Sequence, residues 1–569
     1  MTRQQSTEVP QALSIESADQ FDWDDEQDVV VVGFGGAGVA AALEAVHQGA
    51  SVLAVERFFG GGATARSGGV VYAGGGTSIQ KSEGVEDSPE QMFDYLKMEV
   101  EDAVSDETLR RFCDQSVTNL QWLQHHNVEF SGNIPPVKTS YPTDQYYLYY
   151  SGNESVSSYA EKVKPAPRGH RVKGKGLSGE VLFAALQKSA ISRGVKLQIQ
   201  TEATRLILDE SRQVVGLEVR QIPVGSAAAR KHRRLYRLAE RCHNSARKLA
   251  FRLRDKLAVL ERAEGVVKRI RARKGVVLSA GGFVMNQAMM DQHGGKYVGA
   301  LQLGTSGCNG SGIRLGQGAG GATDRMNKIS VWRFINPPIA FARGIAVNKD
   351  GVRFCSEDVY GAKLGFEVVE NQGNQASLIF NAELRKQALS QSIPGKLPFF
   401  QYMPALMAIF VASKKANTLA ELAEYTGAPL ETLVKTLHGY SKDARTNTRD
   451  ALGKAESFMA NLDEGPWYVL DLDVTNDKFP CPMITLGGLQ VNEATGEVLN
   501  EEGQEIKGLY SAGRNAVGVA SHLYVSGLSI ADCIFSGRRA GRHVVQDDDD
   551  ARTSAEKAPV EQQEVAEAV

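Results

Sequence analysis

The segment from Asp28 to Glu56 constrains the fold more than any other part of this chain. An aliphatic run at 28–32 leads into the turn Gly-Phe-Gly-Gly-Ala-Gly, an alanine-rich stretch follows, and a second aliphatic run ends at Glu56. This order predicts a strand, a tight turn, a helix and a second strand. Such a unit binds a dinucleotide pyrophosphate at the helix N-terminus, while the terminal acid accepts hydrogen bonds from ribose hydroxyls.

Two glycine-rich stretches supply the first candidate cofactor-binding residues. The turn itself contributes Gly33, Gly35, Gly36, Ala37 and Gly38. Gly33 permits the sharp turn, Gly35 lets a phosphate approach the backbone because it has no Cβ, and Gly38 permits close packing of helix on strand. The second stretch follows Glu56 directly, which indicates backbone packed against a flat or anionic group. We expect it to contribute Arg57, Gly62, Ala63, Thr64, Ser67, Gly68 and Gly69.

Cofactor-like sequence returns near the C-terminus. A strand is predicted over 508–512 and a helix over 529–541. The N-terminus of that helix presents a positive dipole end, which can stabilise the anionic edge of a reduced flavin ring. A nicotinamide enzyme does not need such a return, so the pattern favours FAD over NAD. The residues expected to contact the cofactor here are Gly513, Arg514, Ser529 and Ile530. Ala280 and Gly281, at the end of the earlier stretch 275–282, are expected to contact it as well.

The length of 569 residues predicts two or three domains. We expect an α/β, Rossmann-like FAD-binding domain formed by 25–327 and 471–545, with an inserted α+β substrate domain at 328–470. The tails at 1–24 and 546–569 are polar or acidic and are expected to be disordered. No secretory signal and no apolar run of about 18 residues is present, and six scattered cysteines are typical of free thiols in a reducing cytoplasm.

A strongly basic insertion, at about 227–274, interrupts the first domain. Residues 230–274 hold 17 Lys and Arg against four acids, a balance of +13 in a chain of net charge −3. Apolar residues at three- and four-residue spacing predict one amphipathic helix over about 227–261, between a strand at 216–221 and its expected partner at 275–282. Such a segment can lie on anionic lipid, bind nucleic acid or form a coiled coil, and the simpler alternative is a solvated helical hairpin over an oligomer interface. Nucleic acid is not expected, because nothing else in the chain suits it.

Candidate catalytic groups are few. Metal-ligand spacing is lacking, because the ten histidines are isolated except for His125 and His126. Tyr524 lies five residues before the C-terminal helix, with Ser526 close by, and Tyr360 follows a charged turn. A phenol titrates near ~10, so it removes a proton next to a ketone only when hydrogen bonds or positive charge assist it. Ordinary aromatic packing is the alternative for both tyrosines. The tyrosine-rich segment 133–169 is either a self-packed loop or a lid over an apolar ligand.

Together these motifs resemble the fumarate reductase/succinate dehydrogenase flavoprotein superfamily. The likeness lies in the first glycine turn with Glu56, the stretch to Gly69, and the sequences GLYSAGR and SGLSIAD at 508–514 and 526–532. Within that superfamily the chain is similar to the 3-ketosteroid Δ4-(5α)-dehydrogenases. The matching stretches are 74–77, 165–170, 343–345, 356–360 and 536–541. The resemblance covers nearly the whole chain except the two tails and the basic insertion.

The resemblance implies an FAD enzyme of steroid metabolism and lipid degradation that introduces a C4–C5 double bond into a 3-ketosteroid. It implies that Tyr360, Tyr524 and Ser526 are catalytic, with hydride passing from C5 to flavin N5 and a proton leaving C4. Tyr524 is expected to be the base or a proton relay tuned by Ser526. Tyr360 assists at the same proton or polarises the ketone, and a backbone N–H at Gly527 or Leu528 binds the carbonyl.

Two departures from the superfamily refine these expectations. The stretch 522–526 lacks the arginine with which fumarate reductases hold a dicarboxylate, which argues against fumarate reduction. The stretch 60–69 lacks the histidine that binds flavin covalently in the respiratory enzymes, so FAD is expected to be non-covalent. Alternative functions are a Δ1-dehydrogenase, another flavin ene-reductase or desaturase, and, from a different class, an FAD-folded scaffold whose basic helix binds membrane or nucleic acid.

The expected partners are a steroid, a quinone or other electron acceptor, and an anionic membrane surface reached through Arg230–Lys274. The expected location is cytoplasmic, with peripheral attachment to the inner membrane face. The sequence leaves the oligomeric state, the ring-fusion stereochemistry and the physiological electron acceptor open.

Overall fold

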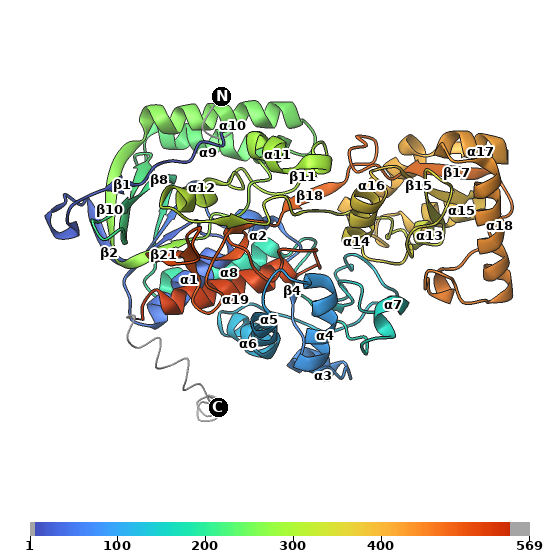
Figure 1. Cartoon of the computed structure of the whole chain (residues 1–569), viewed down its shortest axis with the longest axis horizontal. Helices are drawn as coiled ribbons and strands as arrows, with labels where there is room; N and C mark the ends of the chain where they lie inside the picture. The colour runs from blue at the N-terminus through green and yellow to red at the C-terminus, as the bar shows by residue number, and fades with distance from the viewer. Residues whose placement is uncertain (1–5, 547–569) are drawn as a thin grey trace.

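The computed structural model describes residues 6–546, which form a larger body and a smaller one (Figure 1). A nine-stranded sheet is the centre of the larger body. Its main path runs β1 (Leu13–Ser14), β8 (Thr201–Leu208), β9 (Val214–Gln221), β10 (Val266–Leu278), β2 (Asp25–Val32), β3 (Val52–Glu56) and β7 (Lys196–Ile199), with β21 (Glu505–Ser511) beside β10 and β20 (Glu497–Leu499) beside β21.

The predicted strand–turn–helix–strand unit is confirmed as β2, α1 (Gly36–His47) and β3. The strands β10, β2, β3 and β7 are parallel neighbours, and β21 also pairs with β10 in parallel. The central segments 29–32, 52–55 and 276–278 are covered on both faces, so their residues are almost all valine and leucine rather than alternating. The chain therefore has the α/β fold, with a Rossmann-like core, that the sequence indicates.

The predicted C-terminal return is confirmed by β21 and α19 (Leu528–His543), which packs along α1 (Figure 1). Small residues permit this contact. A Cβ built on Gly537 lies 2.4 Å from the Ala37 carbonyl oxygen, and one on Gly541 lies 2.3 Å from that of Ala41. Because Gly537 lies against Ala37 and Gly541 against Ala41, the two helices run parallel and the first turns of α19 extend beyond the start of α1.

Several shorter elements complete the larger body. They are α2 (Gly62–Arg66), α3 (Ser78–Ser82), α4 (Pro89–Val100), α5 (Asp106–Asp114), α6 (Ser116–His125), α8 (Gly179–Ser192), α11 (Gln287–His293) and α12 (Ser311–Gly318), with a sheet of β4 (Val70–Tyr72), β6 (Gly169–Arg171) and β5 (Leu148–Tyr149). A fully buried ion pair ties β6 to the segment before α4. Arg168 donates to the two carboxylate oxygens of Asp87 at 3.0 and 2.7 Å.

The smaller body contains an antiparallel sheet in the order β14 (Ile345–Asn348), β15 (Ala376–Asn381), β17 (Trp467–Asp471) and β16 (Lys414–Ala416). Its α-helices are α13 (Ile339–Ala342), α14 (Gly361–Phe366), α15 (Ala382–Gln391), α16 (Phe399–Met407), α17 (Leu419–Thr426) and α18 (Leu430–Thr446). One hydrophobic cluster includes residues of both bodies.

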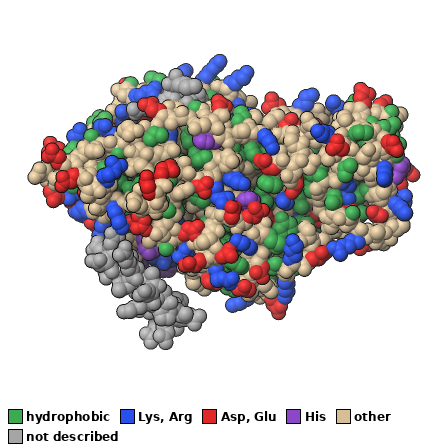
Figure 2. All heavy atoms as spheres, in the orientation of Figure 1, with side chains coloured by type: hydrophobic (Ala, Val, Ile, Leu, Met, Phe, Trp, Pro, Cys, Tyr) green, Lys and Arg blue, Asp and Glu red, His purple; other side chains and the backbone are tan. Residues whose placement is uncertain are grey.

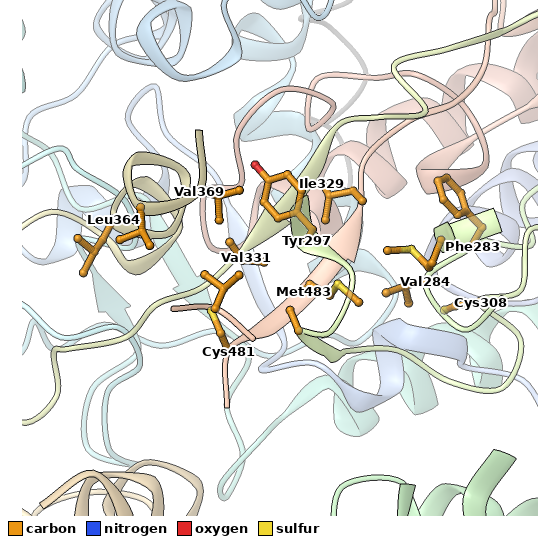
Figure 3. Packing of buried hydrophobic residues seen from close by; sticks show 14 of the residues in the cluster. Phe283, Val284, Tyr297, Cys308, Ile329, Val331, Leu364, Val369, Cys481 and Met483 are labelled. Carbon is orange, nitrogen blue, oxygen red and sulfur yellow. The ribbon is translucent and has the colours of Figure 1, made fainter. Parts of the chain in front are cut away.

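A further sheet of three strands joins the bodies, in the order β11 (Leu301–Gln302), β18 (Pro482–Thr485) and β13 (Ile329–Val331). Figure 3 shows part of the shared core there, where side chains of β13 and β18 lie between α14 and the segment that carries Phe283 and Cys308. Because the two bodies share this core, the surfaces that face each other across the junction can form one site.

The basic insertion differs from its prediction in two ways. It forms two helices, α9 (Ala227–Cys242) and α10 (Arg247–Glu264), which pack on each other as a hairpin, so the hairpin alternative describes its shape better than one helix over 227–261. Residues 266–274 belong to β10, and the partner of β9 is 266–271 rather than 275–282. The strand β10 is long enough to pair with β9 through its first half and with β2 through its second half.

The prediction of disorder over 1–24 is wrong for residues 6–24. Here β1 pairs with β8, and the Trp23 indole donates to the Ala18 carbonyl oxygen at 2.7 Å. Basic side chains of β10 hold the acids of this segment, since Arg271 pairs with Asp19 at 2.5 Å and with Glu26 at 3.2 Å. Residues 1–5 and 547–569, the rest of the two predicted tails, lie outside the described residues.

None of the helices between residues 6 and 546 combines the length and the apolar character that crossing a membrane requires. The Lys and Arg side chains of the insertion project along the upper edge of the molecule, over α10 (Figure 2).

Candidate cofactor and substrate site

A cavity of about 770 Å³ is lined by residues of both bodies. It adjoins the carboxyl ends of β2, β3 and β10, where open α/β sheets bind their ligands. Most predicted cofactor residues line it, namely Gly33, Gly35, Gly36, Ala37, Glu56, Arg57, Gly62, Ala63, Thr64, Ser67, Gly68, Ala280, Gly281, Arg514, Ser529 and Ile530. Gly527, Tyr360, Tyr524 and Ser526 line it as well. The sequence motifs therefore meet in one place.

The remaining three predicted cofactor residues support the cavity wall from behind. A Cβ on Gly38 would lie 2.0 Å from the Gly33 carbonyl oxygen, so this position permits the turn itself. A Cβ on Gly69 would lie 2.6 Å from backbone of Ser178, and one on Gly513 would lie 2.8 Å from Ala37. These glycines allow close packing of the elements that carry the wall.

The turn before α1 fits a pyrophosphate. Gly35 precedes the first turn of α1, and a Cβ built on it meets its nearest neighbour, the Gly61 carbonyl oxygen, at an ordinary 3.8 Å. The space beside Gly35 is therefore open to a ligand that approaches the backbone. Gly33, by contrast, has a φ of 91°, and a Cβ there would lie 2.9 Å from Ala280. The α1 N-terminus adds its dipole and its amides to this cradle.

Glu56 closes the first strand pair at the same end of the cavity. Its carboxylate accepts hydrogen bonds from the backbone amides of Phe34 at 3.0 Å and Phe58 at 2.8 Å. These two bonds fix the carboxylate against the glycine turn. Burial raises the pKa of Glu56, against the influence of both amides. Because a carboxylate oxygen can accept more than one hydrogen bond, Glu56 retains acceptor capacity for ribose hydroxyls.

The candidate catalytic residues converge at the other end of the cavity, beside the N-terminus of α19. Tyr524 packs edge-on against Trp332, with ring centroids 4.6 Å apart, and Tyr360 packs against Phe334 at 5.8 Å. The Ser526 and Tyr149 hydroxyls are 3.3 Å apart. The three hydroxyl residues that the sequence singles out therefore line one cavity, and the sequence missed Tyr149, which lies behind Ser526.

Buried polar contacts hold Tyr360 in position. Its backbone amide donates to the Asn153 side chain at 2.7 Å. The turn before it is held by Glu357, which is fully buried and accepts from Arg353 at 2.9 and 2.7 Å. Lys454 lies 3.1 Å from the same carboxylate. The charged turn that the sequence shows before Tyr360 is thus a buried ion network that orients the tyrosine.

The two candidate tyrosines differ in their electrostatic surroundings. Burial raises the pKa of Tyr360 well above its ordinary value, and the neighbouring phenols of Tyr524 and Tyr149 act in the same direction. Burial also raises the pKa of Tyr524, but the Arg514 guanidinium and the Gly527 amide oppose that rise. Tyr524 is therefore the phenol whose ionised form has a cation and a backbone donor beside it.

Gly527 provides a backbone donor at this end. It has a φ of 89°, and a Cβ there would lie 2.7 Å from the Tyr72 amide, so glycine is required. Of the two amides predicted to bind a carbonyl, that of Leu528 donates to the Val525 carbonyl oxygen at 3.0 Å. The Gly527 amide instead lies beside the Tyr524 phenol, whose pKa it lowers.

Sequence reasoning missed much of the apolar wall. Trp332 and Phe334 precede Tyr360 in the chain, while Phe399, Phe400 and Met403 come from α16. The apolar run over 402–412 and the tyrosine-rich segment were the available signals. Tyr236 and Asn244, from the basic hairpin, also line the cavity. Nothing local in the sequence marks those two, because their place depends on how the hairpin packs.

Comparisons with known proteins show which protein family this chain resembles. A family profile described as "FAD binding domain" matches residues 28–529. A 3-oxo-5-alpha-steroid 4-dehydrogenase of Comamonas testosteroni is 41% identical over 521 residues, which are 89% of this chain and 96% of that protein. A 3-oxosteroid 1-dehydrogenase of Mycolicibacterium smegmatis is 26% identical over 566 residues, covering 88% and 93%.

Among solved structures, a 3-ketosteroid-delta4-(5alpha)-dehydrogenase from Rhodococcus jostii RHA1, in complex with 4-androstene-3,17-dione, is similar to this chain. The TM-score is 0.78 at 30% sequence identity, and the match covers 95% of this chain and all of that one.

Proposed function

This chain belongs to the FAD-binding flavoprotein family that includes 3-oxosteroid 4-dehydrogenases, and from that membership we propose that it introduces the C4–C5 double bond of a 3-ketosteroid. It is an FAD-dependent oxidoreductase. The observation that carries the finer proposal is that Tyr524, Tyr360 and Ser526 meet at the α19 end of the cavity, next to an apolar wall.

The shape and chemistry of that wall support a steroid substrate. Trp332, Phe334 and Ile484 line the cavity around the tyrosines, and α16 adds Phe400 and Met403. A fused hydrocarbon ring system gains free energy by leaving water for such surroundings, at roughly 25 cal/mol per Å² of apolar area. A few polar groups then fix its orientation, as in most ligand sites.

We propose that Tyr524 removes the C4 proton. When bound, FAD supplies the hydride acceptor for the C5 hydrogen. The C3 ketone makes the C4 hydrogen acidic, because the resulting charge spreads onto the ketone oxygen. Arg514 and the Gly527 amide favour an ionised Tyr524, which gives it the role of base. Tyr360, whose pKa is raised further, stays protonated and donates a hydrogen bond to the ketone oxygen.

The serine has a different partner from the one expected. Ser526 was expected to tune Tyr524, but its hydroxyl lies 3.3 Å from Tyr149 and close enough to Tyr360 to oppose the rise in that pKa. We propose that Ser526 and Tyr149 orient the Tyr360 hydroxyl toward the ketone. The Gly527 amide is assigned to the Tyr524 oxygen, so the Tyr360 hydroxyl is the donor to the ketone in this proposal.

We predict that kcat/KM rises with pH between 7 and 9 by about tenfold per pH unit. The base acts in its deprotonated form, and burial raises the pKa of Tyr524 above its ordinary value of 10.0, so the active fraction grows throughout this range. Steady-state rates with a chemical electron acceptor, with FAD retention checked at each pH, measure this slope. A flat profile would contradict the assignment of Tyr524, with its raised pKa, as the base.

A Δ1-dehydrogenase is the second candidate, supported by similarity to the Mycolicibacterium smegmatis 3-oxosteroid 1-dehydrogenase. The products separate the two candidates. A saturated 3-ketosteroid should give the 4-ene product, identified by nuclear magnetic resonance after turnover, whereas formation of the 1-ene would favour the second candidate. An ene-reductase would instead consume a 4-ene steroid in the presence of a reductant.

The domain division and the state of the cofactor are further parts of the proposal. We propose that 328–470 is the substrate domain and that 25–327 and 471–545 form the FAD domain. No histidine occurs among the cavity-lining residues within 6–546, which supports non-covalent FAD. The reduced flavin then passes its electrons to a quinone or another acceptor.

We propose that the outward side of the α9–α10 hairpin contacts an anionic membrane, at the inner face of the cytoplasmic membrane. Exposed cations there include Arg234, Arg241, Lys248 and Arg252. Neutralising these four with glutamine should reduce co-sedimentation with anionic vesicles several-fold, and more so at low salt, because screening weakens such contacts. Equal binding to the vesicles by the variant and the original protein would contradict this proposal. Deleting 230–274 is not a suitable test, because it removes half of β10.

A further inference from the structure

The inner side of the α9–α10 hairpin contacts the strand end that carries Glu56. The Tyr236 ring stacks on Phe58, with centroids 4.6 Å apart and an interplanar angle of 18°, and it lies 5.4 Å from the ring of Phe59. The His232 ring also stacks on Phe58, with centroids 5.8 Å apart and an interplanar angle of 19°. Phe58 is two residues from Glu56, so the hairpin lies against the ribose-binding end of the β2–α1–β3 unit.

A buried ion network fixes this contact. Glu261 of α10 accepts two hydrogen bonds from Arg57, at 3.2 and 2.6 Å, and lies 2.9 Å from the His232 ring nitrogen. Burial alone would raise the pKa of Glu261, but Arg57 and His232 hold it below its usual value. Glu202, from β8, lies 3.8 Å from Arg57. The hairpin is thus joined to the residue next to Glu56 by a charged and largely buried contact.

The hairpin also holds the opposite cavity wall. Glu240 of α9 accepts from the amide and the hydroxyl of Ser306, at 3.0 and 2.6 Å. Arg254 of α10 donates to the same hydroxyl at 2.9 Å, and His243 lies 2.7 Å from the Gln302 carbonyl oxygen. The neighbours of Ser306 in the chain, residues 303–305, 307 and 308, line the cavity. The hairpin therefore connects the Glu56 side of the cavity to the 303–308 side.

Tyr236 is the hairpin side chain best placed to meet a ligand. It lines the cavity together with Glu56, Arg57 and the residues 201–203. Burial raises the pKa of Tyr236, and the carboxylates of Glu240 and Glu56 act in the same direction, which confirms that Glu56 is close. This end is separated from the tyrosine group at α19 by the pyrophosphate cradle at Gly33–Gly36.

We propose that the α9–α10 hairpin is a clamp on the adenosine half of FAD, in which Tyr236 forms an aromatic wall for the adenine. Glu261, through its contacts to Arg57 and His232, fixes the hairpin in this position. The ligand class is the adenine nucleotide end of the dinucleotide. The inner face of the hairpin serves the cofactor, whatever its basic outer face contacts. The inference rests on FAD binding and is independent of the steroid.

The test is the rate at which the holoenzyme releases FAD, followed by flavin fluorescence after dilution. An aromatic face against a base contributes enough that Tyr236→Ala should speed release roughly 10- to 100-fold, while Tyr236→Phe, which keeps the ring, should stay near the original rate. Arg237→Ala, an exposed change one residue away, is the matched control and should leave release unchanged.

The network is tested by a second pair of variants on α10. Glu261→Gln should speed FAD release several-fold, because it weakens the contacts to Arg57 and His232, whereas Glu264→Gln, at an exposed position one turn on, should have no effect. The visible absorbance spectrum of the bound flavin should be the same in all variants, because none of them changes the surroundings of the isoalloxazine ring.

Unchanged release from Tyr236→Ala overturns the proposal. So does faster release that is accompanied by an altered flavin spectrum, since that result would mean a general loosening of the site rather than loss of an adenosine contact.

Discussion

Replacing Tyr524 by phenylalanine is expected to lower kcat by about 10²- to 10⁴-fold, the usual contribution of a positioned acid–base group. The change removes the hydroxyl but retains the ring that packs on Trp332, so the fold, FAD content and steroid binding should persist. Stopped-flow reduction of the flavin by the steroid measures the effect directly. The same variant should lose the predicted rise of rate with pH.

Tyr468→Phe is the matched control. Tyr468 stacks on Phe380 in the smaller body and does not line the cavity, so the loss of its hydroxyl should leave turnover unchanged. A Tyr524→Phe enzyme that reduces its flavin within about tenfold of the original rate would remove Tyr524 from the role of base. A scaffold with an FAD fold would show no dependence on this hydroxyl at all.

Gly35→Val is expected to weaken FAD binding by roughly 10²- to 10⁴-fold while leaving the fold intact. The backbone at Gly35, with φ −96° and ψ −160°, suits a β-branched residue, and its Cβ meets ordinary contact only at 3.8 Å. The added side chain instead fills the space that a pyrophosphate needs. Losing two hydrogen bonds to charged oxygens, each about 1.5–3 kcal/mol, accounts for the predicted change.

The readouts are the FAD content of the purified protein, an FAD titration and the thermal unfolding of the protein. Gly439→Val is the control, because Gly439 is exposed on α18 and a Cβ there meets no atom within 4 Å. Full FAD occupancy in Gly35→Val at low micromolar enzyme would show that the cofactor does not approach this turn.

The sequence was sufficient for the cofactor core, because its signals are local. The valine run at 29–32, the glycine turn and the alanine-rich α1 each carry their own periodicity, and the C-terminal helix α19 shows the same small residues. Close helix packing requires small residues at set positions, so the pattern predicts both the elements and their contact.

The insertion shows where local signals end. Apolar spacing continues across 243–246, so nothing such as Gly or Pro marks the break between α9 and α10. The basic residues suggested a surface element, yet Arg271 pairs with Asp19, and Glu261 of the same insertion pairs with Arg57. These partners lie more than 200 positions away, and no periodicity reports such contacts.

The site residues show the same limit. Tyr360, Tyr524 and Ser526 were found through motifs, whereas tertiary packing alone places Tyr236 at the cavity and the buried Tyr149 behind Ser526. The protonation states of the two tyrosines also depend on contacts that only the structure shows. Burial raises the pKa of both Tyr360 and Tyr524, and only the placement of Arg514 and the Gly527 amide distinguishes their roles.

The most direct test of the account is the anaerobic reaction of the oxidised holoenzyme with single steroids, followed by the visible absorbance of the flavin. A 3-ketosteroid saturated at C4–C5, offered in its 5α and 5β forms, should bleach the flavin in at least one form and yield one equivalent of the 4-ene product. A 4-ene-3-ketosteroid should leave the flavin oxidised. Bleaching by the 4-ene steroid alone, with formation of a 1,4-diene, would contradict the proposed reaction.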